Sequence, residues 1–150
     1  MSLIRNKKAS LNFEILERFV AGIELHGFEV KSLRAHRGKL EGAHVVIRGG
    51  EAFLVGADIP AWQVANAPKA YDSLRPRRLL LTKKELAQLI EAEAQKGQTL
   101  IALSVFAKGS KLKLEFAIAR GKKKYDKRES IKKRDSARDI AREHKVQLRS

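Results

Sequence analysis

The 150-residue chain contains no cysteine, which excludes disulfide bonds and metal sites built on thiolates. It has no apolar run approaching the roughly 20 residues of a membrane-spanning helix. Its first residues, MSLIRNKKAS, lack the apolar core of a secretory signal. We therefore expect a cytoplasmic protein that does not cross a membrane.

Acidic side chains are scarce relative to basic ones. The chain has 17 Asp and Glu against 32 Lys and Arg, so its formal net charge is +15. Such an excess opposes compaction by self-repulsion and is typical of proteins that bind nucleic acid or an anionic membrane. Hydrophobic residues make up 43% of the chain, which is enough for one packed domain.

Signatures of catalysis are also missing. The four histidines form no HExxH pair, no serine lies in a GxSxG context, and the phosphate-binding pattern GxxxxGK[ST] does not occur. The carboxylates of Glu51, Asp58 and Asp72 could hold Mg²⁺, but no spacing selects them. We predict no enzyme activity, no cofactor and no metal site, with a small Mg²⁺-dependent nuclease as an alternative.

The sequence before the basic C-terminal segment predicts mostly strands. Apolar residues alternate imperfectly in 12–27, where Gly22 predicts a bend or bulge. Segment 43–59 predicts a hairpin that turns at Gly49 and Gly50, and 99–121 predicts a second hairpin. A short helix is expected at 28–36 and a long loop at 61–78. Twisted antiparallel strands with few helices predict a mainly β fold, an antiparallel barrel of the OB type with flanking helices.

The clearest helix is predicted at 82–97. Thr82 is its N-cap and Glu85, three residues later, completes a capping box. Gly97 is expected to end it. Its predicted buried face consists of Leu86, Leu89, Ile90 and Ala94.

Positive charge is concentrated toward the C-terminus. Residues 121–150 contain 12 Lys and Arg against 5 Asp and Glu, and few apolar residues. We predict a basic tail that is disordered when free and helical on a polyanion. In the body, Lys111 and Lys113 on the last strand and the run Arg75 to Arg78 are expected to follow a phosphate backbone. The phenylalanines are expected in the core, while Trp62 either covers the barrel or stacks on a base.

Two stretches carry a resemblance to a known family. AGIELHGFEVKSLRA (21–35) and ARGKKKYDKRESIKKRD (119–135) closely resemble segments of the SmpB family of SsrA-binding proteins, and the order of the elements between them is similar. The resemblance implies an OB-type barrel (1–120) with a basic tail (121–150). It also implies binding to the tRNA-like domain of tmRNA and delivery of that RNA to stalled ribosomes for trans-translation, without bond chemistry.

We expect a monomer. The resemblance also implies roles for individual residues. In the body it places Asn6, Lys7, Leu80 and Lys113 on the RNA-binding surface, to which the charge pattern adds Lys111. The tail residues expected near the decoding centre and its small-subunit RNA are Gly121, Lys122, Lys123, Tyr125, Asp126, Lys127 and Arg128.

Alternatives remain at single positions and for the whole chain. Leu80 could instead be a core residue, and Glu29 could hold the short helix in place instead of touching RNA. The sequence departs from the family at Val20, where a glutamate is common, and at Thr82, where asparagine or histidine is common. The alternative function is that of a non-specific OB-type RNA binder or ribosome-associated structural protein.

Overall fold

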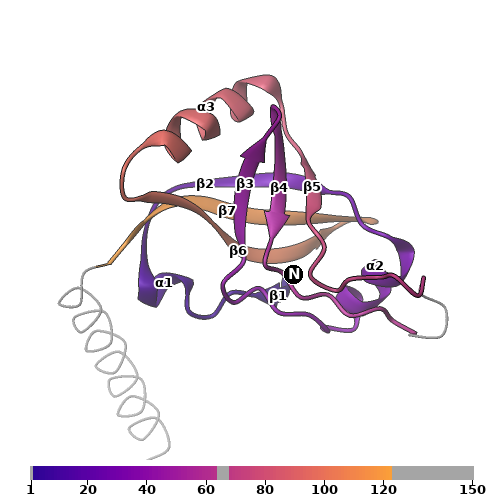
Figure 1. Cartoon of the computed structure of the whole chain (residues 1–150). Coiled ribbons are helices and arrows are strands. Elements are labelled where there is room, and N and C mark those ends of the chain that lie inside the picture. The colour runs from indigo at the N-terminus through magenta and orange to yellow at the C-terminus, as the bar shows by residue number, and fades with distance from the viewer. Residues whose placement is uncertain (1, 64–67, 123–150) are drawn as a thin grey trace, which may run out of the picture.

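A computed structural model describes residues 2–63 and 68–122. Its elements, in chain order, are β1 (Ser2–Arg5), α1 (Ala9–Asn12), β2 (Phe13–Ile23), α2 (Gly27–Arg34), β3 (His44–Arg48), β4 (Glu51–Val55), β5 (Arg77–Leu80), α3 (Lys83–Ala94), β6 (Gln98–Lys108) and β7 (Lys111–Gly121). Figure 1 shows α3 across one side of the barrel, with α1 and α2 near opposite ends of the long strands.

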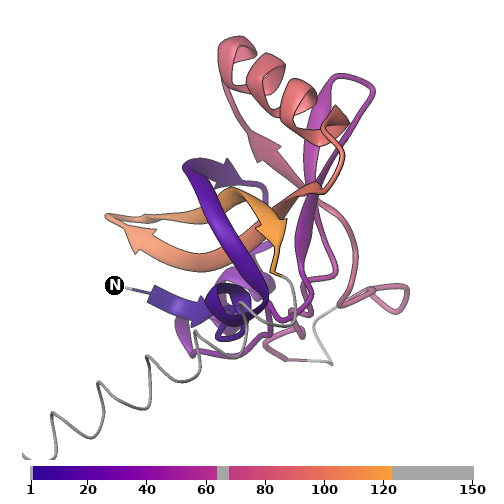
Figure 2. The same ribbon diagram turned by 90° about the vertical axis from the view of Figure 1, so that its left-hand side faces the viewer.

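The strands form one antiparallel sheet that closes on itself. Its order is β1-β6-β3-β4-β5-β2-β7, and a further pairing of β6 with β7 completes the ring. β6 and β7 pair along almost their whole length, and β2 follows β7 from Phe13 opposite Gly121 to Gly22 opposite Lys113. The long curved hairpin of β6 and β7 is seen from the side in Figure 2. The predicted mainly β, OB-type barrel with flanking helices is confirmed.

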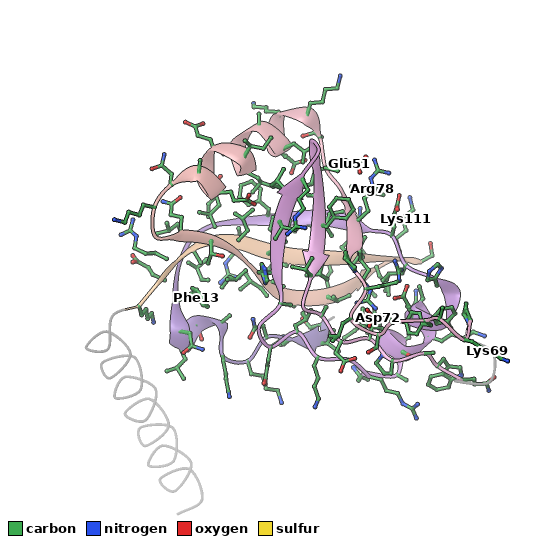
Figure 3. The ribbon with its side chains drawn as sticks, in the orientation of Figure 1. Phe13, Glu51, Lys69, Asp72, Arg78 and Lys111 are labelled. Carbon is green, nitrogen blue, oxygen red and sulfur yellow. The ribbon has the colours of Figure 1, made fainter. Side chains whose placement is uncertain are left out.

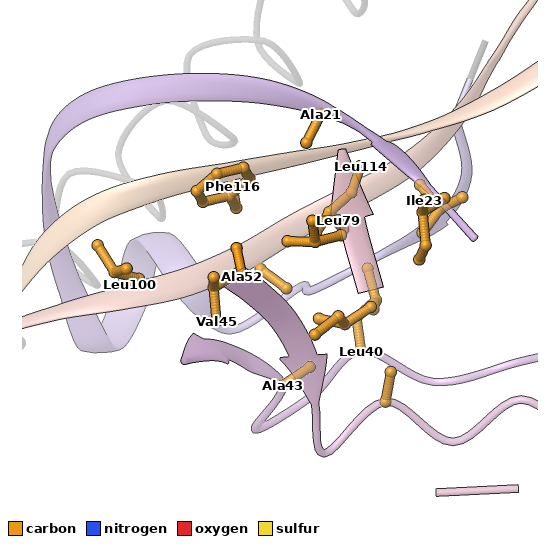
Figure 4. Packing of buried hydrophobic residues seen from close by; sticks show 14 of the residues in the cluster. Ala21, Ile23, Leu40, Ala43, Val45, Ala52, Leu79, Leu100, Leu114 and Phe116 are labelled. Atoms are coloured by element: carbon orange, nitrogen blue, oxygen red, sulfur yellow. The ribbon is translucent and has the colours of Figure 1, made fainter. Parts of the chain in front are cut away.

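The core fills the inside of this ring. Leu79, Leu100, Leu114 and Phe116 are among its buried side chains and converge between the strands (Figure 4). Phe19 on β2 stacks on Phe116 on β7, with ring centroids 5.6 Å apart. Burial of aromatic rings of this size contributes strongly to stability, and here the two rings lie opposite each other in the pairing of β2 with β7.

Local signals in the sequence correctly located several elements. The hairpin of β3 and β4 turns at Gly49 and Gly50, which have φ angles of 59° and 76°. A residue with a side chain is strained in that left-handed region, so two glycines favour the tight turn. Helix α3 begins with the predicted capping box of Thr82 and Glu85.

Other local predictions were wrong. The irregularity in β2 falls between Ile15 and Glu17, whereas Gly22 is regularly paired on both sides. Strand β5 begins inside the segment predicted as a loop. Ile90 and Ala94 are exposed, because α3 turns Leu89 and Ala92 toward the barrel instead.

The phenylalanines do not all reach the core. Phe19 and Phe116 are buried, and Phe13 packs on a small separate cluster beneath α1. Phe53 and Phe106 are only half-buried, on the outward faces of their strands. The prediction of a core role therefore holds for two of the five phenylalanines expected there. Strand alternation directs the other three away from the main core.

Candidate nucleic-acid interface

Leu80 and Lys113 lie on either side of Gly22 on the outside of the barrel. Both are paired with Gly22, Leu80 from β5 and Lys113 from β7. A Cβ atom on Gly22 would lie 3.3 Å from Leu80 Cδ1, so the missing side chain lets Leu80 lie close across β2. Leu80 is 52% exposed, which contradicts the alternative of a core role. An apolar side chain and an ammonium group therefore share one open surface.

Two shallow hollows meet at this pair. The first, of about 640 Å³, is lined by Val20, Leu80, Lys83 and Lys113 among others. The second, of about 330 Å³, lies toward the β6–β7 turn and includes Lys111, Lys113 and Leu80. The structure thus brings together three of the five predicted body residues. We name this surface, made by Val20, Gly22, Leu80, Lys111 and Lys113, the β7 face.

Asn6 and Lys7 lie farther along the same side of the barrel. The Asn6 backbone N–H donates to the Leu103 carbonyl at 2.8 Å, and its side-chain amide donates to the Ala102 carbonyl at 3.0 Å. These bonds dock the turn between β1 and α1 on β6. Lys7 is exposed. Asn6 and Lys7 line a further hollow of about 470 Å³ and are not in direct contact with the β7 face.

An ion pair lies between these two groups. Arg18 Nη1 on β2 lies 2.6 Å from Glu115 Oε1 on β7. Both residues line the hollow that contains Asn6 and Lys7. Glu115 is two residues from Lys113, so the two side chains point to the same side of β7. The residues predicted to bind RNA are therefore spread along one outward surface with the pair of Arg18 and Glu115 in the middle.

The arginine-rich run 75–78 does not form the continuous exposed surface that a phosphate backbone could follow, and the prediction was wrong for Arg77. Arg77 is fully buried and Arg75 is mostly covered, both held by the carboxylate of Glu29. Arg78 is exposed but lies 3.2 Å from the carboxylates of both Glu24 and Glu51 (Figure 3 shows Arg78 beside Glu51). All the arginines of the run are thus already paired within the protein.

Glu29 is the centre of a buried polar network. It accepts two hydrogen bonds from Arg77, at 3.0 and 2.7 Å, and further ones from Arg75. It also accepts from the His26 backbone N–H at 2.7 Å, which caps the first turn of α2. Burial opposes ionisation of Glu29, but the bonds from Arg75, His26 and Arg77 outweigh it and lower its pKa to about 2. Glu29 is therefore ionised in the folded protein at neutral pH.

The same network fixes the long connection between β4 and β5. Arg77 donates to the backbone carbonyls of Ala57 at 2.7 Å and Ser73 at 2.9 Å. The Tyr71 hydroxyl accepts from Arg77 at 3.1 Å and lies 3.0 Å from Glu29. Burial and the bond to Glu29 raise the pKa of Tyr71 to about 12. Glu29 was expected either to contact RNA or to hold the short helix in place. The structure supports the second interpretation.

This network could not be identified from the sequence. Glu29 and its partners are more than 40 residues apart in the chain, and no motif joins them. The available signal was weak: a single acidic residue inside an amphipathic helix, next to Val30 and close to Leu33, at a position that the helical period can turn inward.

The root of the tail is attached to α1. Gly121 is the last residue of β7, opposite Phe13. The Lys122 backbone N–H donates to the Asn12 carbonyl at 2.9 Å, and its ammonium group donates to the Ser10 carbonyl at 2.7 Å. The other tail residues predicted to function lie outside the described residues: Lys123, Tyr125, Asp126, Lys127 and Arg128.

The carboxylates considered for Mg²⁺ do not gather. Glu51 pairs with Arg78, and Asp72 accepts from the Leu74 backbone N–H at 2.9 Å. Asp58 lies in a backbone bridge with Lys39. Within 2–63 and 68–122, no group of three or more His, Asp or Glu residues is placed to hold a metal ion. Nor does any helix in that part of the chain have the length and apolar character needed to cross a membrane.

Comparison with known proteins agrees with this architecture. Residues 3–146 match the family model described as SmpB protein. Proteins named SsrA-binding protein are 46% identical in Mesoplasma florum and 47% identical in Gloeobacter violaceus, each over 140 residues. These alignments cover 93% of this chain and 94% and 91% of the two relatives. A third, from Burkholderia vietnamiensis, is 44% identical over 142 residues, which is 95% of this chain and 96% of that one.

A solved structure is similar over most of the fold. It is described as "tmRNA-SmpB: a journey to the center of the bacterial ribosome", and it matches with a TM-score of 0.67 and 35% sequence identity. The match covers 85% of this chain and 92% of the other. From the family model, the relatives and this structure, the chain belongs to the SmpB family.

Proposed function

We propose that this protein binds the tRNA-like domain of tmRNA and delivers it to stalled ribosomes for trans-translation. The observation that carries the proposal is the β7 face. On it, the exposed Leu80 and the ammonium groups of Lys111 and Lys113 form one surface in a chain that belongs to the SmpB family. Lysines contact phosphates without regard to sequence, whereas an apolar side chain on the same surface favours a particular RNA shape.

The proposed division of labour separates the barrel from the tail. The barrel (1–120) carries the RNA-binding residues Asn6, Lys7, Leu80, Lys111 and Lys113. The tail (121–150) contacts small-subunit RNA near the decoding centre and becomes helical there. The attachment of Lys122 to Ser10 and Asn12 supports this proposal, because the tail then starts at α1, which follows Asn6 and Lys7 in the chain.

The proposed role involves no bond chemistry, and a cytoplasmic location follows from the proposed partners. The protein acts as a monomeric adaptor whose charge attracts RNA and whose shape selects it. Prolonged incubation of labelled RNA with the protein and Mg²⁺ tests the nuclease alternative. RNA that stays intact is the expected result, and carboxylate-dependent cleavage would overturn this part of the proposal.

Competition is the central test. A labelled transcript of the tRNA-like domain is bound to the full-length protein at moderate salt, and excess bulk tRNA is added. Binding that survives supports the proposal, whereas equal displacement by any RNA would identify a non-specific RNA binder. Sequencing of RNA recovered with the protein from a cell lysate gives an independent check.

A truncation tests the role of the tail. The deletion begins at residue 123, so that the pairing of Gly121 and the bonds of Lys122 to α1 are kept. We expect most of the affinity for the tRNA-like domain to remain and peptide tagging on stalled ribosomes to be lost. Tagging by the truncated protein would contradict the proposed division.

A further inference from the structure

The outward side of α2 carries cationic side chains. Glu29, Ser32 and Leu33 face the interior, so Lys31 and Arg34 point outward. Glu29 is the only acidic residue of α2, and its charge is buried against two arginines. Within the described part of the chain, none of the ion pairs involves Lys31, Arg34 or the nearby Arg37. This leaves an uncompensated cationic surface.

An exposed aromatic ring lies beside these cations. Trp62 is 36% exposed, and the guanidinium group of Arg37 lies 4.9 Å from the centroid of its ring. The Trp62 backbone N–H donates to the Phe28 carbonyl at 3.2 Å, and Ser32 Oγ donates to the Pro60 carbonyl at 2.6 Å. The segment that carries the ring is therefore held on α2. A guanidinium stacked on an indole offers a flat surface on which a nucleobase can stack.

This surface continues the β7 face. Arg34 donates to the carbonyl of Ser110, in the turn between β6 and β7, at 3.1 Å. Lys111 follows directly in the chain, and Val30 of α2 lines the same hollow as Lys111 and Lys113. A phosphate backbone that follows Lys113 and Lys111 around this turn therefore reaches α2. Figure 1 shows α2 at the end of the molecule opposite α1 and the root of the tail.

We propose that the surface formed by Lys31, Arg34, Arg37 and Trp62, here named the α2 face, is a second part of the RNA-binding surface. Lys31 and Arg34 contact phosphates, and an unpaired base of the same RNA stacks on the pair of Arg37 and Trp62. The inference rests on the proposed function, since it takes the RNA that occupies the β7 face to extend onto α2. It favours RNA over other polyanions because cations alternate here with a stacking surface.

The protein contains its own probe of this site, because Trp62 is the only tryptophan in the chain. A transcript of the tRNA-like domain is titrated into the full-length protein while Trp62 fluorescence is recorded. Free N-acetyltryptophanamide, titrated in parallel, corrects for light absorbed by the RNA. Anisotropy of the labelled transcript reports binding independently. We expect fluorescence quenching that saturates together with the anisotropy, because the stacked base contacts the ring.

Variants separate the two kinds of contact. Trp62→Leu and Arg37→Gln are each expected to weaken binding about tenfold, as for loss of one stacked base. Lys31→Gln is expected to lower the slope of log affinity against log salt by about one contact. Lys96→Gln, an exposed lysine beyond the end of α3, is the matched control and should bind as the wild type does. If Trp62→Leu lowers stability in urea, Arg37→Gln still tests the stack, since Arg37 is exposed.

The possible failures are distinguishable. Saturating anisotropy with unchanged Trp62 fluorescence, and with Arg37→Gln binding as tightly as the wild type, would overturn the α2 face while the proposed function stands. Absence of saturable anisotropy would overturn the proposed function and this inference with it.

Discussion

Replacement of Glu29 by glutamine tests the buried network most directly. Glutamine has nearly the same shape, so the substitution removes the charge without opening a cavity. Arg77 would then stay buried with no carboxylate beside it, although its bonds to the carbonyls of Ala57 and Ser73 would remain. Removal of one partner from a buried ion pair costs about 3–5 kcal/mol, because the other charge is left uncompensated.

The pKa of Glu29 gives a second route to the magnitude. Its change from 4.5 to about 2 on folding corresponds to about 3 kcal/mol, at ~1.4 kcal/mol for each pKa unit. Both routes therefore give a destabilisation of about 3 kcal/mol or more for Glu29→Gln. This is a large part of the ~5–15 kcal/mol that stabilises an ordinary domain.

The effect has a defined dependence on pH. Because folding lowers the pKa of Glu29, the ionised carboxylate stabilises the protein fully above pH 4.5, and this stabilisation is lost as the pH falls toward about 2. The difference in unfolding free energy between the wild type and Glu29→Gln should therefore be constant at neutral pH. It should shrink as the pH is lowered below 4.5.

Urea unfolding followed by far-UV circular dichroism measures these differences. The matched control is Glu51→Gln, which removes an exposed carboxylate 3.2 Å from Arg78. Exposed pairs contribute only about 0–1 kcal/mol, so the control should unfold close to the wild type. If Glu29→Gln were no less stable than Glu51→Gln at pH 7, the network would not hold α2 and the reasoning would be refuted.

Three further predictions follow from single contacts. Thr82→Ala removes the side-chain cap of α3 and should lower the unfolding free energy by about 1 kcal/mol, whereas Lys84→Ala should not; equal thermal melts would contradict the cap. Leu80→Ala should weaken binding to the tRNA-like domain with a stability change below about 1 kcal/mol, because the side chain is half exposed; a loss of about 2–5 kcal/mol would indicate a core residue. Lys113→Gln should lower the salt slope of RNA binding by about one contact, and an unchanged slope would place Lys113 off the RNA.

The sequence alone determined the features that depend on neighbouring residues. The two-glycine turn of the β3–β4 hairpin and the capping box of α3 are local, because a few adjacent residues supply all the atoms involved. The alternation in β7 likewise predicted the burial of Leu114 and Phe116. The resemblance of two segments to the SmpB family was also present in the chain itself, and the family model and the relatives confirmed it.

Tertiary structure decided which side of each element faces the interior. In β5, alternation requires that Arg77 and Arg78 point to opposite sides, but only the contact with Glu29 of α2 shows that Arg77 is the buried one. Leu80 is likewise exposed beside Gly22, because its neighbour Leu79 on β5 packs in the core. On α3, packing against β6 buries Leu89 and leaves Ile90 exposed. Which of these side chains faces the interior depends on contacts between distant segments. The hydrophobic periodicity and the charge pattern of the sequence therefore do not specify it.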